Sequence, residues 1–121
     1  MSDFINVGVG IDIVEINRFK QRPYPTNQSF YTKIFSEDEI NYCLKFSDPY
    51  PHFAGKFTIK ESVIKSIPIK IQPHDIITSH KNSKPIVKLK PSRLKDYNFL
   101  VSVSHENKFA IAIVYSQLPK I

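Results

Sequence analysis

Apolar and polar residues alternate strictly near the start of the chain. Between residues 5 and 13 the odd positions are all isoleucine or valine, and the even positions are Asn6, Gly8, Gly10 and Asp12. A period of two predicts a strand with one buried face. Two glycines leave the opposite face without side chains directly ahead of Asp12, so we expect a ligand or another chain to approach the backbone there.

Short helices are predicted after this strand. Residues 15–22 favour a helix that a proline pair ends, and residues 26–35 have room for another turn or two. Ser36 begins a clearer helix, because Ser36 and Glu39 have the spacing of a capping box. We expect this helix to end near Phe46.

The main helix is predicted from about residue 52 to residue 67, where Pro68 ends it. Its apolar residues predict one buried side, made of Phe53, Phe57, Val63, Ile64 and Ile67.

Two hairpins complete the predicted elements. Residues 76–80 and 85–90 are β-like runs, joined by a polar turn that contains Asn82, Ser83, Lys84 and Pro85. Residues 99–105 and 108–115 alternate well and are joined by a turn of sequence HENK. An early strand, central helices and late hairpins together predict an α+β fold, in which a mostly antiparallel sheet that includes the first strand packs with the long central helix.

The composition is that of a single domain spanning residues 1–121. Hydrophobic residues make up 41% of the chain and charged residues 23%, and no apolar run approaches the roughly 18 residues of a membrane helix. We therefore expect no membrane partner. The formal charge of +6 favours an anionic partner, although a solvated basic surface without any partner has the same balance.

The cysteine content bears on the cellular compartment of the protein. Cys43 is the only cysteine, so the chain has no intramolecular disulfide and a reducing environment is favoured. The first residues carry neither a basic region nor an apolar block, which argues against a signal peptide. We expect a cytoplasmic protein, with a mitochondrial or plastid matrix as the alternative.

The main helix carries the candidate chemistry. Glu61 and Lys65 are four residues apart, and Lys56 lies about one and a half turns earlier. An exposed ion pair is the simplest interpretation of Glu61 and Lys65 alone. However, Mg²⁺ needs only one or two protein carboxylates, which Asp12 and Glu61 can provide, and Lys65 is then in place to neutralise a phosphate.

Four motifs resemble the holo-[acyl-carrier-protein] synthase family of 4'-phosphopantetheinyl transferases. Two are family signatures, at residues 10–15 (GIDIVE) and 57–65 (FTIKESVIK), and two are shorter, at residues 82–85 (NSKP) and 102–105 (SVSH). They span nearly the whole chain in the family's order. The chain departs from the pattern at Lys56, Ser62 and Ser83, where the family usually has arginine, alanine and glycine.

The resemblance implies a reaction and the residues that carry it. The phosphopantetheine arm of coenzyme A is expected to move to a serine of an apo acyl carrier protein, with release of adenosine 3',5'-bisphosphate. Asp12 and Glu61 are the expected ligands of Mg²⁺, with Mn²⁺ as an alternative, and Glu61 is expected to help remove the serine proton. Lys65 is the third expected catalytic residue, because it would stabilise the transferring phosphate or the leaving group.

The resemblance also implies binding residues. The expected coenzyme contacts are Lys56, Lys60, Lys65, Lys84, Pro85, Ser104 and His105. A basic patch is expected to meet the acidic carrier protein, and it consists of Arg18, Lys20 and Arg22, with a solvated helix face as an equal alternative for Lys20 and Arg22. The remaining histidines match no motif and are expected at the surface: His52, His74 and His80.

A chain of this length has little wall with which to enclose a coenzyme, so identical subunits are expected to complete the site. The family's short members form trimers with sites at the subunit interfaces, and a homotrimer is the expected assembly.

Two other functions are compatible with parts of the sequence. A small basic domain can bind nucleic acid, but the lysines are scattered and no recognition motif is present, so we expect no nucleic acid partner. A non-catalytic interaction protein that keeps the fold is the other alternative, although Asp12, Glu61 and Lys65 are all present together.

Overall fold

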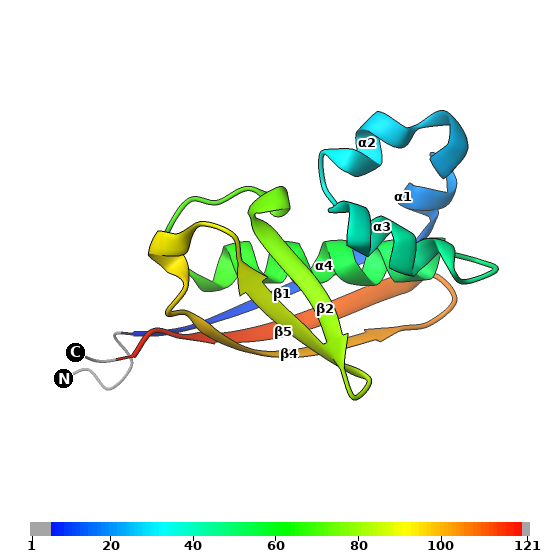
Figure 1. The fold of residues 1–121 in the computed structure, drawn as a ribbon. Coiled ribbons are helices and arrows are strands. Elements are labelled where there is room, and N and C mark those ends of the chain that lie inside the picture. The colour runs from blue at the N-terminus through cyan, green and yellow to red at the C-terminus, as the bar shows by residue number, and fades with distance from the viewer. Residues whose placement is uncertain (1–5, 120–121) are drawn as a thin grey trace.

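The computed structural model describes residues 6–119 as helices packed against curved antiparallel sheets (Figure 1). The strands are β1 (Val7–Glu15), β2 (Ile76–Lys81), β3 (Lys84–Leu89), β4 (Asn98–His105) and β5 (Phe109–Gln117). The α-helices are α1 (Asn17–Lys20), α2 (Gln28–Thr32), α3 (Glu37–Leu44) and α4 (Tyr50–Ser66). Short 3-10 turns lie at Tyr24–Thr26, Pro73–Asp75 and Ser92–Leu94.

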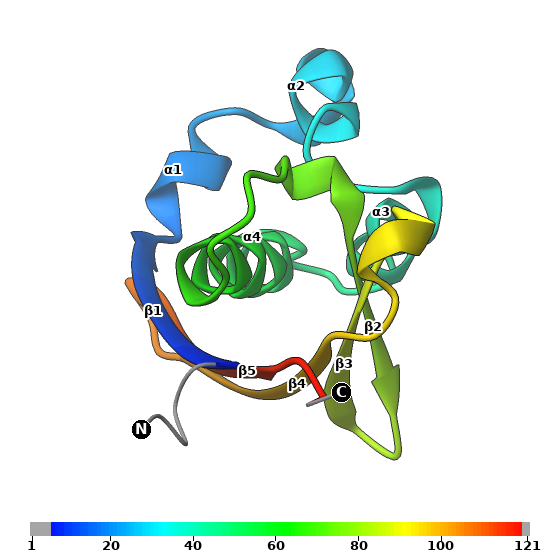
Figure 2. The same ribbon diagram turned by 90° about the vertical axis from the view of Figure 1, so that its left-hand side faces the viewer.

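The strands form two antiparallel sheets around α4. The larger sheet has the order β1-β5-β4, and β2 pairs with β3 in a separate hairpin. Figure 2 shows α4 end-on in the concave side of this arrangement, with α1 and α2 on the side of the helix away from the larger sheet. The predicted α+β class, the two hairpins and the inclusion of the first strand in the sheet are confirmed.

Helix α4 is buried nearly all round because it separates two apolar clusters. Phe53 and Phe57 pack with the aromatic residues of the α1 to α3 region, whereas Ile59 and Val63 pack with the sheets. The predicted apolar residues of this helix are indeed inward, but the polar residues between them are buried as well. Each of these polar residues therefore needs a hydrogen-bonding partner.

The two faces of β1 are the reverse of the prediction. The side chains of Val9, Ile11 and Ile13 are 62%, 54% and 59% exposed, and the glycine face lies against α4. A Cβ atom added at Gly8 or Gly10 would lie 1.8 Å from a carbonyl oxygen of α4. The bare backbone thus packs against a helix of the same chain, so the prediction that a ligand or another chain approaches it is wrong. Ile5, the first residue of the predicted strand, lies outside the described residues.

Other local predictions differ only at their ends. The Ser36 and Glu39 capping box is present at the start of α3. Helix α4 begins at Tyr50, two residues earlier than predicted, with a proline in its first turn. The turn of the first hairpin consists of Asn82 and Ser83, both with positive φ, so Lys84 already belongs to β3. Of the helices that the structure describes, none is long and apolar enough to cross a membrane.

We predict that Gly10→Ala destabilises the protein by about 3 kcal/mol, because the new methyl group overlaps the Ser62 carbonyl and separates β1 from α4. Denaturant unfolding followed by circular dichroism measures this loss. Gly55→Ala is the matched control: its Cβ would meet only Val103 at 3.8 Å, and removing a mid-helix glycine should stabilise the protein by about 0.5 kcal/mol. Equal stability of the two variants would contradict the packing described here.

Candidate functional site

Asp12 is fixed between β1 and α4. Its Oδ2 atom accepts a hydrogen bond from the Thr58 hydroxyl at 2.8 Å, and its Oδ1 atom lies 3.2 Å from the Lys65 ammonium nitrogen. The same ammonium donates to the Ile11 carbonyl at 3.1 Å. The Asp12 side chain is only 16% exposed, whereas that of Lys65 is 54% exposed, so the pair opens to solvent on the lysine side.

Glu61 joins this cluster from the turn of α4 that precedes Lys65. Partial burial and the neighbouring Asp12 carboxylate raise the pKa of Glu61, and Lys65 and Arg18 act in the opposite direction. The predicted catalytic trio of Asp12, Glu61 and Lys65 is therefore assembled within one chain.

The cluster has a donor set that fits a hard divalent cation. Within residues 6–119 no group of three or more histidine, cysteine, aspartate and glutamate side chains is placed to hold a metal. Asp12 and Glu61 offer two carboxylates, and their mutual repulsion would be relieved by a cation between them. Mg²⁺ commonly binds through one or two carboxylates and takes its other ligands from water and phosphate. These two residues are suitable for that ion.

Lys60, one of the expected coenzyme contacts, is fully buried on another side of α4. Its ammonium lies 2.7 Å from Glu39, 2.8 Å from the Ile34 carbonyl and 3.2 Å from the Pro73 carbonyl. These three acceptors match its three hydrogens. Lys60 therefore has no donor left for a phosphate, and its place in the structure is that of an internal ion pair.

Lys56 lies at a cavity of about 500 Å³ formed by α4, the β2-β3 hairpin and the end of β4. Two other expected coenzyme contacts, His105 and Pro85, also line this cavity. So do His52 and His80, which the motifs do not include. His52 lies four residues before Lys56 on α4, so helical spacing alone could have linked these two, whereas His80 comes from β2 and only the fold brings it to the cavity.

Aromatic stacking holds the histidines of this cavity. The His52 ring lies 3.5 Å from that of Phe46, and the His80 ring lies 4.7 Å from that of Tyr42. Burial lowers the pKa of His52 and of His80, and nearby His105 and Lys56, respectively, add to the effect. The third of these histidines without a motif, His74, is exposed beside Asp75, as expected.

Two expected coenzyme residues lie apart from both groups. Lys84 is exposed at the start of β3, and Ser104 is exposed on the outer face of β4. The basic residues expected to bind the carrier protein lie along and just beyond α1. Arg22 stacks over Phe30, and Lys20 forms an exposed ion pair with Asp48.

The two groups of candidate residues lie on opposite faces of α4. Lys56 and Lys65 are nine residues apart, which is two and a half helical turns, or a rise of about 13.5 Å with the side chains about 180° apart. We call the group around Asp12 and Glu61 the carboxylate cluster, and the cavity beside Lys56 the histidine cavity. One chain therefore does not bring these two sites together around a single small molecule.

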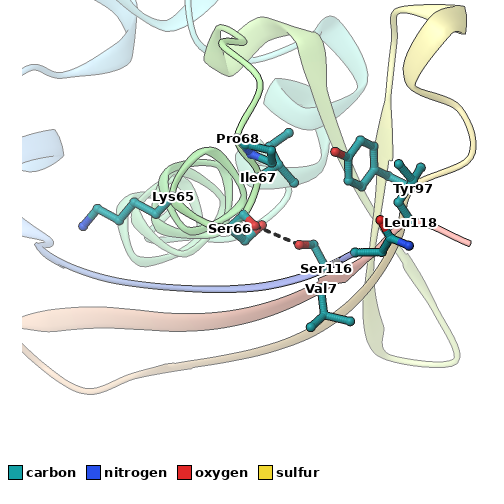
Figure 3. Close-up of a pocket in the computed structure, with 9 residues that line it drawn as sticks. Val7, Lys65, Ser66, Ile67, Pro68, Tyr97, Ser116 and Leu118 are labelled. Carbon is teal, nitrogen blue, oxygen red and sulfur yellow. Dashed lines mark hydrogen bonds between the residues drawn. The ribbon is translucent and has the colours of Figure 1, made fainter. Parts of the chain in front are cut away.

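A further cavity, of about 470 Å³, lies at the carboxyl end of α4 (Figure 3). It is lined by Ile67, Pro68 and Tyr97 among others, and the Ser116 hydroxyl donates to the Ser66 carbonyl across it at 2.9 Å. Figure 3 shows Lys65 extending away from the other labelled residues. This cavity includes neither Asp12 nor Glu61.

Comparison with known proteins places these features in one family. The family model of the 4'-phosphopantetheinyl transferase superfamily matches residues 8–114. A holo-[acyl-carrier-protein] synthase of Thermodesulfovibrio yellowstonii is 34% identical over 110 residues, covering 88% of this chain and 95% of the relative. One from Chlamydia felis is 36% identical over 114 residues, covering 87% and 92%.

Solved structures agree with the sequence relatives. A holo-(acyl-carrier-protein) synthase from Bacillus anthracis in complex with CoA (3',5'-ADP) has a TM-score of 0.78 and 26% identity, covering 93% of this chain and 96% of that one. The Helicobacter pylori synthase in complex with coenzyme A has a TM-score of 0.75 and 29% identity, covering 88% and 96%.

We predict that Glu61→Gln raises the melting temperature at about pH 8. The raised pKa of Glu61 means that the fold disfavours its charge, and this cost is fully present above the folded-state pKa and disappears below the usual value of 4.5. The gain should therefore shrink as the pH falls toward 4.5. Scanning calorimetry across this range measures it, with Glu15→Gln, on an exposed carboxylate, as the control. A lower melting temperature at about pH 8 would contradict the described repulsion.

Proposed function

Because the chain belongs to the 4'-phosphopantetheinyl transferase superfamily, and within it to the holo-[acyl-carrier-protein] synthases, we infer that it transfers the 4'-phosphopantetheine group of coenzyme A to a serine of an apo acyl carrier protein. The observation that carries this function is the Asp12, Glu61 and Lys65 cluster, which unites both signature motifs at one site. The products are the holo carrier protein and adenosine 3',5'-bisphosphate.

The reaction forms a bond between the serine oxygen and the phosphorus attached to pantetheine, and it breaks the bond from that phosphorus to the bridging oxygen of the pyrophosphate. Asp12 and Glu61 would hold Mg²⁺, which supplies positive charge to the pyrophosphate when it is bound. Glu61, which comes from the turn of α4 before Lys65, is the carboxylate that would help remove the serine proton. Lys65 neutralises charge that develops on the departing phosphate.

The histidine cavity is our proposed binding site for the rest of the coenzyme. Lys56 and His105 provide groups that can bind phosphate, and Pro85 provides an apolar wall. Lys84 is exposed beside Pro85, at the turn of the β2-β3 hairpin. Fold similarity to synthases solved with coenzyme A supports this proposal.

We propose a homotrimer in which the carboxylate cluster of one subunit meets the histidine cavity of a neighbour. Its support is the position of these groups on opposite faces of α4 and the apolar outer face of the larger sheet. This outer face exposes Val9, Ile11, Ile13, Leu100, Phe109, Ile111 and Ile113. Contiguous apolar surface of this kind is typical of protein interfaces, and Ser104 lies on the same side of β4 as Leu100.

Arg18, Lys20 and Arg22 form the proposed contact with the acidic carrier protein, since all three are exposed on or just beyond α1 and Arg18 is near enough to Glu61 to oppose the rise in its pKa. The formal charge of +6 favours the same encounter. The lone Cys43, which is buried and unpaired with any other cysteine, suits our proposal of a cytoplasmic location.

The reaction is tested by the intact mass of an apo acyl carrier protein incubated with this chain, coenzyme A and Mg²⁺. We expect a gain of one phosphopantetheine group that requires the metal and falls at least about 100-fold in rate with Glu61→Ala. EDTA and the variant are the controls. A folded protein that modifies none of several carrier proteins would contradict the proposal and favour a non-catalytic binding role.

The assembly is tested by light scattering after size exclusion. We expect Ile113→Asp, in the central strand of the exposed face, to convert a trimer into monomers, because three buried carboxylates would lack partners. Leu44→Asp is the matched control, since Leu44 has similar exposure, 41% against 47%, but lies on α3. A wild-type chain that is monomeric at all concentrations would refute the shared site.

A further inference from the structure

Lys56 lines the histidine cavity although nearly all of the residue is buried. The residue is only 4% exposed. Its ammonium lies 3.0 Å from the Thr78 hydroxyl and 3.3 Å from the Thr78 carbonyl oxygen, so both contacts come from one residue of β2. The ammonium also lies 4.7 Å from the centre of the Tyr42 ring.

The orientation of the Thr78 hydroxyl follows from its other partner. Thr78 Oγ1 lies 2.6 Å from Glu39 Oε2, which also accepts the Thr78 backbone N–H at 2.8 Å. Burial opposes the charge of Glu39, but Lys60 and these hydrogen bonds outweigh it and lower the pKa of Glu39. Glu39 is therefore an ionised acceptor. The single hydrogen of the Thr78 hydroxyl points to Glu39, and its lone pairs face Lys56.

Within residues 6–119 this arrangement leaves one ammonium hydrogen of Lys56 without a hydrogen-bond acceptor. Two hydrogens of Lys56 are directed at Thr78, and an ammonium carries three. A lysine has a flexible stem and a single charged point, whereas an arginine carries a rigid fork that orients itself on a phosphate. A lysine in a phosphate-binding position therefore gains most from an external anchor.

We propose that Thr78 is a positioning residue for coenzyme binding, which it achieves by holding the Lys56 ammonium so that its third hydrogen faces a phosphate group in the cavity. This inference rests on the proposed function. Glu39, fixed in turn by the Ser36 amide at 2.8 Å and by Lys60 at 2.7 Å, provides the rigid end of the chain of hydrogen bonds.

The experiment is a double-mutant cycle on coenzyme A affinity, measured by titration calorimetry on the full chain in its native assembly. Thr78→Val keeps the shape of the side chain and should weaken binding about fivefold to tenfold. Thr78→Ser, which keeps the hydroxyl, should stay within about twofold of wild type. Lys56→Met should weaken binding at least about tenfold, and adding Thr78→Val to it should cause no further loss.

Transfer kinetics distinguish positioning from general damage. Thr78→Val should raise KM for coenzyme A with kcat nearly unchanged, at a temperature where calorimetric scans show every variant folded. An equal loss of affinity from Thr78→Val in the presence and absence of Lys56 would overturn the proposal, and so would wild-type affinity. If the wild-type chain neither binds coenzyme A nor modifies a carrier protein, the proposed function itself fails.

The anchor is also measurable without any ligand. In nitrogen-15 NMR spectra of the lysine ammonium groups, Lys56 should give a slowly exchanging signal that disappears in Thr78→Val. The signal of Lys60, which has three acceptors of its own, should remain and serves as the internal control. A Lys56 signal that is unchanged in Thr78→Val would overturn the anchoring role whatever the activity.

Discussion

The close approach of β1 to α4 determines most of this structure. Gly8 and Gly10 allow the strand to lie against helix carbonyls at a distance that no side chain would permit. Serine hydroxyls add contacts between α4 and β5, the strand beside β1: the Ser62 hydroxyl lies 3.1 Å from the Ala112 carbonyl oxygen of β5, and the Ser116 hydroxyl donates to the Ser66 carbonyl of α4. Because the helix is so close, Asp12 reaches Thr58 and Lys65 directly, and a two-carboxylate site forms without any loop to support it.

The same contact has a consequence on the other side of the sheet. Since the glycine face takes the helix, the isoleucine and valine face of β1 must point outward, where β5 adds its own apolar residues. A chain folded in this way buries an apolar core and still exposes an apolar sheet face. Assembly through that face would bring together two groups of residues that a single α4 holds on opposite sides.

Buried charge organises the other half of the molecule. Glu39 caps α3, pairs with Lys60 and bonds Thr78, so it links α3, α4 and β2 through one carboxylate. Breaking such a pair would leave an unpartnered charge in the core, which costs far more than losing a surface ion pair. The arrangement explains why two lysines one turn apart on α4 differ. Lys60 is an internal member of the hydrogen-bond network, whereas Lys56 lies where the network meets the histidine cavity.

The sequence alone determined what depends on local patterns and on chemistry that residues carry with them. The capping box, the stop at Pro68, the two hairpins and the α+β class follow from short-range spacing, and the two signature motifs were enough to single out Asp12, Glu61 and Lys65 as candidates. Only the tertiary structure decided which face of β1 meets α4, because the alternation favours burial of the isoleucine and valine face, whereas only the glycine face lets the helix come this close. The tertiary structure likewise decided that Lys60 is internal and that His80 and His105 join His52 and Lys56 of α4, since these outcomes depend on packing between elements far apart in the chain.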